Sequence, residues 1–202
     1  MRPPPSDPWS AAIAHLVEVD ARWLSPIERA GPCQIRPRRD RFGTIVRAII
    51  GQQISARAAA TIDARLRGIA GKTHEPLALL AQGEAGLRRV GLSGVKARYV
   101  LNVAEAVADG RLPLSRMGRW KDEAIIARMT EIKGIGVWTA QMFLIFAMSR
   151  PDVLPTGDLG VRAGLRTFHG LAEMPTPAQC IPLAEPWRPF RSVASWYLWR
   201  GF

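Results

Sequence analysis

The chain has 202 residues, 48% of them hydrophobic, which is enough for one large domain or two small lobes with a sizeable core. Lysine and arginine number 28 against 17 acidic residues, so the formal net charge is +11 at pH 7. Such a basic chain favours a polyanionic partner, either nucleic acid or an anionic membrane surface. No run of about 18 apolar residues is present to span a bilayer, and residues 1–9 lack the apolar stretch of a secretion signal. These features favour nucleic acid over a membrane.

The N-terminal part of the chain has the pattern of successive helices. A first helix is expected over residues 9–23, and the next begins after Asp40, whose carboxylate suits an N-cap position. The apolar residues of this second helix recur with the spacing of one helix face, at Phe42, Ile45, Val46, Ile49, Ile50 and Ile54. A third helix is expected over 59–69, and Gly71 stops it.

The middle of the chain continues the helical pattern. Two short helices are expected between residues 76 and 90, and Ser93 can then cap a long helix that runs to Gly110. Residues 121–132 are amphipathic again, and an apolar helix follows over 137–148.

The C-terminal part completes an all-helical prediction. After a loop punctuated by prolines, a helix begins near Asp158 and ends at Gly170, and residues 177–202 hold two more helical patterns. No strand-like alternation of any length occurs. Several helices joined by short loops predict an all-α fold.

The most informative local feature is the short connection between residues 132 and 140, in which Gly134 and Gly136 flank Ile135 between two helices. Glycine permits a positive φ and lets the backbone approach another surface closely. Ile135 can fill the groove between the helices, and the amides that open the second helix can then bind a phosphate. The alternative is a plain helix–helix turn with glycine as a C-cap, which the basic charge disfavours.

A carboxylate follows about twenty residues later, in the segment Leu154-Pro155-Thr156-Gly157-Asp158. Taken alone, Asp158 is most simply an N-cap. Taken with the hairpin, however, the chain resembles the helix-hairpin-helix, Gly/Pro…Asp superfamily of DNA glycosylases, and most of all its 3-methyladenine DNA glycosylase II branch. The resemblance covers roughly residues 42–199 and rests on five segments in the same order, namely 47–55, 91–97, the hairpin, the Asp158 loop and 187–192.

The resemblance implies an architecture of two helical lobes with the active site in the cleft between them. Residues 41–147 would form a central lobe that ends with the hairpin helices. Residues 1–40 and 148–202 would together form the second lobe. Asp158 is expected where the two lobes join.

The resemblance makes Asp158 the catalytic residue of base excision from duplex DNA that contains alkylated bases. Positive charge builds on the deoxyribose as the base leaves, and a carboxylate near the anomeric carbon stabilises it and orients the attacking water. An alkylated purine already carries positive charge and leaves as a neutral base, so one carboxylate suffices. The expected substrates are 3-methyladenine, 7-methylguanine and ethenoadenine, released by hydrolysis of the N-glycosidic bond.

The target nucleotide must flip out of the helix, and the gap that it leaves must be held open. The resemblance places the DNA wedge at Gln52, Gln53 and Ile54. It places the pocket for the flipped base at Trp138, Met142 and Trp199, because an electron-poor alkylated base stacks well on indole. Core packing is the alternative for each tryptophan, since the chain contains seven.

The hairpin is expected to hold the DNA backbone through Lys133, Gly134, Ile135, Gly136 and Thr139. By the same resemblance, backbone carbonyls near Thr130, Ile132 and Ile135 could bind Na⁺ or K⁺, with no metal held by a side chain. Related glycosylase/lyases carry a nucleophilic lysine two residues after the second hairpin glycine, where this chain has Trp138. We therefore expect base removal without AP-lyase activity.

No cofactor is expected to be required. The two cysteines, Cys33 and Cys180, lack metal-ligand spacing, so neither an Fe–S cluster nor a disulfide framework is predicted. The chain is expected to be cytoplasmic, nucleoid-associated and monomeric. Alternatives are a non-catalytic duplex-DNA-binding hairpin module, a glycosylase for mismatched or oxidised bases, and an RNA-binding helical protein.

Overall fold

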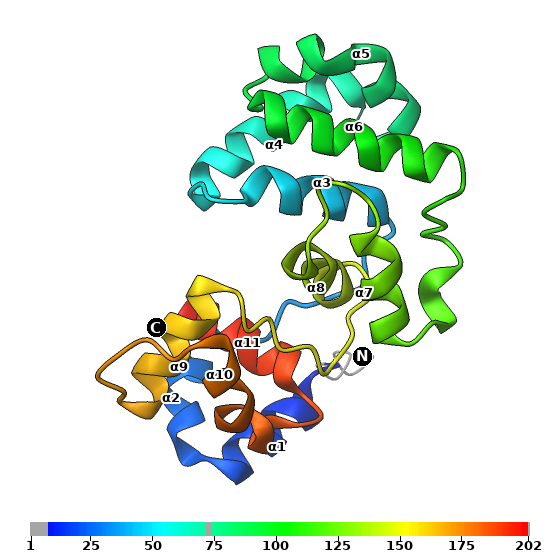
Figure 1. Ribbon diagram of the computed structural model, residues 1–202. Helices are drawn as coiled ribbons and strands as arrows, with labels where there is room; N and C mark the ends of the chain where they lie inside the picture. Colours follow the sequence, from blue (N-terminus) through cyan, green and yellow to red (C-terminus); the bar gives the residue numbers. More distant parts are fainter. Residues whose placement is uncertain (1–7, 72–73, 202) are drawn as a thin grey trace, which may run out of the picture. The chain divides into compact units, whose positions relative to one another are not determined.

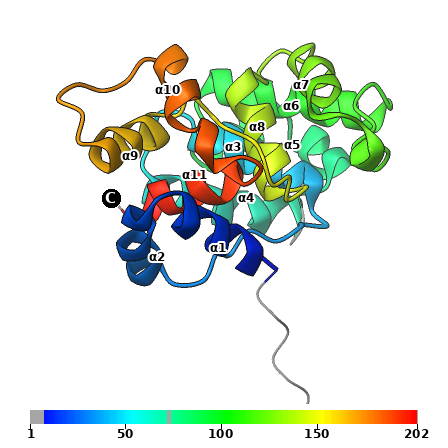
Figure 2. The same ribbon diagram turned by 90° about the horizontal axis from the view of Figure 1, so that it is seen from below.

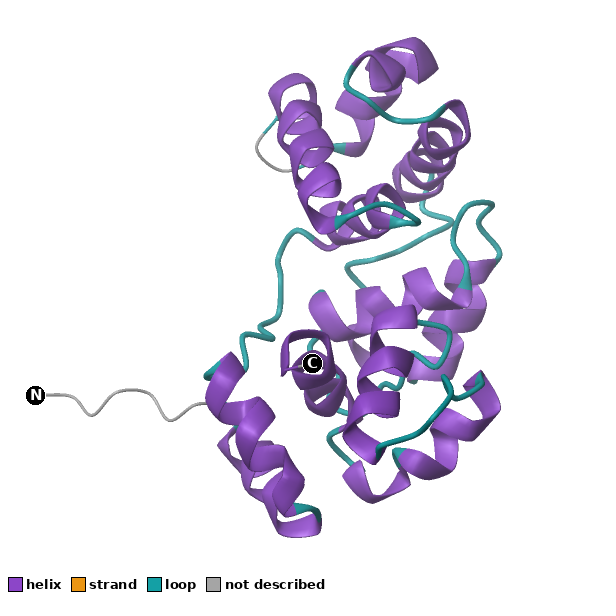
Figure 3. Ribbon diagram, turned by 90° about the vertical axis from the view of Figure 1, so that its left-hand side faces the viewer, coloured by secondary structure: helices purple, strands orange, loops and turns teal. Residues whose placement is uncertain are grey.

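A computed structural model describes residues 8–71 and 74–201. Within these residues the chain forms helices and loops but no strand (Figure 3), so the predicted all-α class is confirmed. The expectation that the chain begins without a secretion signal falls mainly on residues 1–7 and lies outside the described residues. No helix in the described part is both long and apolar enough to cross a bilayer.

The chain divides into two compact units. One unit is Pro37–Met148, and the other joins the described residues up to Arg36 to those from Ser149 onward. In the unit Pro37–Met148, the segment that precedes residue 41 contacts the C-terminal end of the same unit. The backbone N–H of Arg38 donates to the carbonyl of Ala147 at 3.1 Å.

The unit formed by Pro37–Met148 is built around α3 (Figure 1). Its elements are α3 (Arg41–Gly51), α4 (Ala56–Ala70), α5 (Pro76–Arg89), α6 (Gly94–Ala108), the 3-10 turn η2 (Met117–Arg119), α7 (Asp122–Thr130) and α8 (Val137–Phe146). Helix α3 packs against α4, α6 and α8. The N-terminus of α3 is capped as predicted, since Oδ1 of Asp40 accepts the N–H of Gly43 at 2.8 Å.

The apolar face predicted for α3 is correct except at its last position. Five of its six predicted residues are buried, from Phe42 to Ile50. Ile54 is 37% exposed, because the helix ends at Gly51 and the chain turns through Gln53 with a left-handed φ of 56°. Ile54 therefore belongs to a loop that faces solvent, not to the core.

A polar cluster anchors the start of α3. Asp40 pairs with Arg47 at 3.0 Å and lies 3.9 Å from Nδ1 of the buried His74, whose Nε2 is 3.0 Å from Asp63. Burial raises the pKa of Asp40, but the neighbouring His74 and the hydrogen bond from Arg47 outweigh burial and hold that pKa well below its usual range. The cluster thus ties the first turn of α3 to α4 and to the segment that follows it.

Other local predictions in this unit are also confirmed. Ser93 caps α6 through its hydroxyl, which accepts the N–H of Lys96 at 3.3 Å. The two short helices expected between residues 76 and 90 form α5, which is broken at Gly83 by a φ of 61° and a ψ of −178°.

The second unit is built around α11 (Figure 2). Its elements are α1 (Ser10–Val19), the 3-10 turn η1 (Ala21–Trp23), α2 (Leu24–Ala30), α9 (Leu159–His169), α10 (Pro177–Leu183), the 3-10 turn η3 (Glu185–Trp187) and α11 (Arg191–Gly201). Helix α11 packs against α1, α2 and α9. The single helix expected over residues 9–23 ends at Val19, because the extended Asp20 starts a new turn by accepting the N–H of Arg22.

Candidate functional site

Asp158 precedes the first residue of α9 and caps that helix. Its Oδ1 accepts the backbone N–H of Val161 at 2.8 Å. The side chain is half-buried at the helix N-terminus, where the aligned peptide dipoles stabilise a negative charge. The N-cap interpretation of Asp158 is therefore correct, and it is compatible with a catalytic role for the same carboxylate.

Trp199, near the end of α11, holds the same oxygen of Asp158. The indole Nε1 donates to Oδ1 at 2.8 Å. The sequence prediction gave Trp199 a stacking role in the base pocket, and the hydrogen bond to Asp158 was not foreseen. With one oxygen fixed by both Val161 and Trp199, the orientation of the carboxylate is set before any ligand arrives.

Two glycines allow the two helices to approach so closely. A Cβ at Gly160 would lie 2.8 Å from Cδ1 of Trp199 and 3.1 Å from Oδ1 of Asp158. A Cβ at Gly164, one turn later, would lie 2.7 Å from Cβ of Leu198 and 3.1 Å from its carbonyl oxygen. The sequence analysis missed both glycines, although their spacing of four residues places them on one face of α9.

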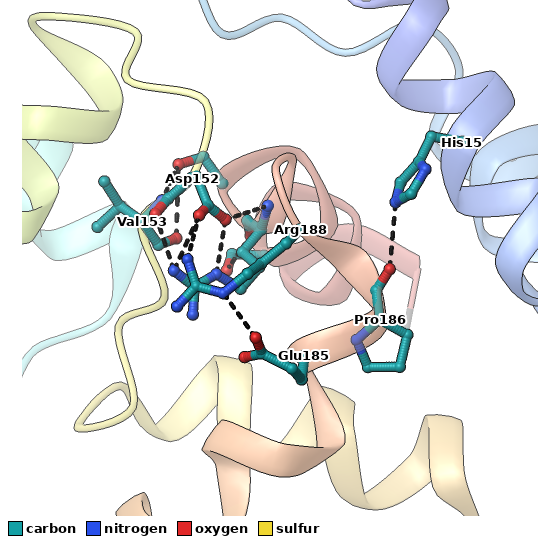
Figure 4. Close-up of polar contacts among 9 residues, drawn as sticks. His15, Asp152, Val153, Glu185, Pro186 and Arg188 are labelled. Atoms are coloured by element: carbon teal, nitrogen blue, oxygen red, sulfur yellow. Dashed lines mark hydrogen bonds and ion pairs between the residues drawn. The ribbon is translucent and has the colours of Figure 1, made fainter.

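The loop that leads to Asp158 is fixed to the other end of α11 (Figure 4). The carboxylate of Asp152 accepts Nε of Arg191 at 2.6 Å and Nη1 of Arg188 at 2.7 Å. The hydroxyl of Ser192 accepts the N–H of Val153 at 2.9 Å. The segment 187–192, which carried part of the family resemblance, therefore has a structural explanation. Arg191 and Ser192 at the start of α11 and Trp199 near its end therefore hold the loop that carries Asp158 at two separate points.

The first glycine of the hairpin between α7 and α8 has the positive φ and the close approach predicted for it. Gly134 adopts a φ of 110°, and a Cβ there would lie 2.5 Å from Cβ of Tyr99 on α6. Ile135 is only 4% exposed, as expected for a residue that fills the groove between the helices. Nδ2 of Asn102 donates to the carbonyl of Lys133 at 3.1 Å. Helix α6 thus sets the shape of the turn.

The second hairpin glycine differs from the first. Gly136 has an ordinary φ of −92°, and a Cβ built on it would meet no other atom within 4 Å. The residue is exposed at the N-cap of α8, whose first amides have no carbonyl partner within the helix. Neither backbone conformation nor internal packing requires glycine at this position.

Thr139 corrects one prediction. It was expected among the residues that contact the DNA backbone, but it is only 1% exposed. Its hydroxyl accepts Nε2 of Gln52 at 3.2 Å. The side chain of Thr139 therefore contacts the predicted wedge loop and is too buried to reach a phosphate. Gln52 is turned inward by the same contact, while Gln53 and Ile54 are exposed.

The remaining predicted pocket residues lie on α8. Trp138 and Met142 are one turn apart on one face of that helix, with Trp138 half-buried and Met142 only 6% exposed. Asp158 and Trp199 belong to the other unit, where the hydrogen bond brings them together.

The described residues contain no group of three or more His, Cys, Asp or Glu side chains suited to hold a metal ion. Cys33 and Cys180 are both buried and do not form a disulfide, and burial raises the pKa of Cys180.

Comparisons with known proteins give a consistent result. Residues 46–189 match the family described as HhH-GPD superfamily base excision DNA repair protein. DNA-3-methyladenine glycosylase 1 of Schizosaccharomyces pombe is 33% identical over 195 residues, covering 94% of this chain and 86% of that protein. The solved structure of the S. pombe 3-methyladenine DNA glycosylase in complex with abasic DNA aligns with a TM-score of 0.85 at 33% identity, over 94% of this chain and 95% of that one. A DNA-3-methyladenine glycosidase from Bacillus halodurans aligns with a TM-score of 0.77 at 34% identity, over 94% and 88% of the two chains.

Proposed function

Because this chain belongs to the HhH-GPD superfamily of base excision DNA repair proteins, we propose that it is a DNA glycosylase that removes alkylated bases from duplex DNA. The relatives named DNA-3-methyladenine glycosylase support alkylated purines as the substrate class. The basic chain, with a net charge of +11, suits a polyanionic substrate. We also propose that the protein is a monomer and that it acts in the cytoplasm, in association with the nucleoid.

The observation that carries this proposal is the carboxylate of Asp158, fixed through Oδ1 by Val161 and Trp199. In the proposed reaction the bond between C1′ and the base nitrogen breaks, and its electron pair leaves with the base. The carboxylate stabilises the positive charge that develops on the sugar. Water then adds to C1′, and its proton passes to Asp158 or to solvent. A positively charged alkylated base departs neutral and needs no separate acid.

We propose that the enzyme removes the base without cutting the strand. Trp138 occupies the position at which related lyases carry a nucleophilic amine. Its indole offers a stacking surface for an electron-poor base, and Met142, one turn later on α8, completes the pocket wall on that side.

The proposed function is tested with duplex DNA that contains methylated purines or ethenoadenine at one position. Free base is measured by chromatography, and strand cleavage is measured with and without alkali. We expect release of free base and strand breaks only after alkali. Tight duplex binding without release of any base would instead favour a non-catalytic DNA-binding module, and breaks before alkali would contradict the absence of lyase activity.

We propose that the amides at the start of α8 bind a DNA phosphate, which gives a separate prediction at Gly136. The change Gly136→Ala should lower the melting temperature only slightly, because alanine is a weaker N-cap than glycine but the new methyl group meets no atom within 4 Å apart from its chain neighbours. It should weaken duplex binding roughly tenfold, because the methyl group would separate the α8 amides from a phosphate. Gly68→Ala on exposed α4, which also meets nothing within 4 Å, is the matched control. Fluorescence anisotropy with labelled duplex measures both affinities, and equal affinities for the two variants would contradict this role of the hairpin.

We also propose that the carbonyls near Thr130, Ile132 and Ile135 bind Na⁺ or K⁺. Carbonyl oxygens suit alkali cations. The Ile132 carbonyl accepts the N–H of Ile135 at 3.0 Å and has a second lone pair. Replacing both cations by a large organic cation at constant ionic strength should weaken duplex binding several-fold, as judged by anisotropy. Unchanged affinity would rule out the cation.

A further inference from the structure

The turn between α3 and α4 presents two exposed side chains in an unfavourable backbone conformation. Gln53 has a φ of 56° and, with Ile54, is exposed. The left-handed region costs free energy for a residue with a Cβ. Such an outlier persists only when neighbouring contacts impose it. Two neighbouring helices, α6 and α8, make contacts that hold this turn.

The first contact comes from Lys96 in the opening turn of α6, which lies beside α3 (Figure 1). Its Nζ donates to the carbonyl of Ile50 at 2.8 Å and to that of Gln52 at 2.6 Å. These carbonyls lie at the C-terminus of α3, where a cation interacts favourably with the helix dipole. Burial also lowers the pKa of Lys96, because a partly buried ammonium group is less well hydrated.

The second contact comes from α8. The amide of Gln52 donates to the buried hydroxyl of Thr139 at 3.2 Å. Gln52 is thus held through its backbone carbonyl by α6 and through its side chain by α8. The next residue is Gln53, so the direction in which the chain leaves Gln52 decides where Gln53 and Ile54 point.

We propose that Lys96 is a positioning residue that holds Gln53 and Ile54 in place as the tip that enters the DNA helix. Gln52 anchors this tip instead of belonging to it. The proposal rests on the proposed glycosylase function, and it assigns Lys96 to opening the duplex, not to breaking the glycosidic bond. Lys96 itself contacts neither the base nor the sugar in this role.

The test compares Lys96→Met with the native chain on one lesion placed in duplex and in single-stranded DNA, under single-turnover conditions. Methionine keeps much of the stem of lysine but removes the charge and the donors. We expect the duplex rate to fall by about tenfold or more, as for a lost hydrogen bond to a charged group. The single-stranded rate should stay within about twofold, because no duplex needs to be opened.

Two further variants make the result specific. Lys96→Arg retains the charge and can still donate to the carbonyls, so it should restore most of the duplex rate. Lys121→Met removes one charge from an exposed site in the same unit and should leave the ratio of the two rates unchanged. A 2-aminopurine placed beside the lesion becomes more fluorescent when the neighbouring bases unstack. The increase in its fluorescence on protein binding should be smaller for Lys96→Met than for the native chain, and unchanged for the other two variants.

The outcomes separate the two proposals. All rates are compared at a temperature at which circular dichroism finds every variant folded. An unchanged rate ratio for Lys96→Met, a parallel loss on both substrates, or a failure of this variant to fold would overturn the role of Lys96. Absence of base release by the native chain on either substrate would instead overturn the proposed function.

Discussion

Replacing Asp158 with asparagine should lower the single-turnover rate of base release by about 10²- to 10⁴-fold, the range expected when a catalytic carboxylate is lost. The change removes the charge but keeps an oxygen that can accept from Val161 and Trp199, which hold Oδ1 at 2.8 Å each. Asparagine is as good an N-cap as aspartate. The melting temperature should therefore stay close to that of the native chain, and duplex affinity should be equal or higher because one negative charge is gone.

Asp158→Ala is the matched comparison. It removes both the charge and the cap of α9, so it should show the same loss of rate together with a loss of about 1 kcal/mol in the free energy of unfolding. Chemical denaturation measures the second effect. If Asp158→Asn released base at near the native rate, the carboxylate would be only a helix cap and its proposed role in catalysis would fail.

Replacing Gly160 with alanine should reduce base release by roughly 10- to 100-fold, which corresponds to the loss of one hydrogen bond to a charged group. The new Cβ would lie 2.8 Å from Cδ1 of Trp199 and must displace the indole from Asp158. Gly160 is exposed, and alanine favours a helix more than glycine does by about 1 kcal/mol. Folding stability should therefore be unchanged or slightly higher while activity falls.

A double-mutant cycle checks this interpretation. Trp199→Phe removes the indole donor but keeps an aromatic ring for stacking. Because Gly160→Ala and Trp199→Phe would break the same contact, the double variant should release base no more slowly than the slower single variant. Fully additive losses would show that Gly160 acts by another route than Trp199.

Gly164→Ala should have the opposite effect, a loss of folding stability. A Cβ at this position would meet Cβ of Leu198 at 2.7 Å and the Leu198 carbonyl at 3.1 Å. Backbone cannot move aside as an indole can, so α9 and α11 must separate at a cost of about 1–3 kcal/mol in folding free energy. Gly160 and Gly164 lie one turn apart on one helix, yet one substitution should impair catalysis and the other stability.

The sequence by itself determined the helical class, most helix positions and the family. Periodicity identified the buried face of α3, and cap residues located the starts of α3 and α6, because these features depend on contacts within a few residues. The motif around Asp158 also singled out the carboxylate. Helix ends were less reliable, as Ile54 shows. The turn after α3 is contacted by Lys96, which lies more than 40 positions later in the sequence.

Tertiary structure alone decided which side chains meet. Trp199 and Asp158 are 41 positions apart and form a hydrogen bond only because Gly160 and Gly164 let α11 approach α9. Thr139 was assigned to DNA from its place in the hairpin, but its hydroxyl lies buried against Gln52, 87 positions away. Local patterns carry no information about such partners, because a long-range contact is set by how helices pack and not by the spacing of residues within one of them.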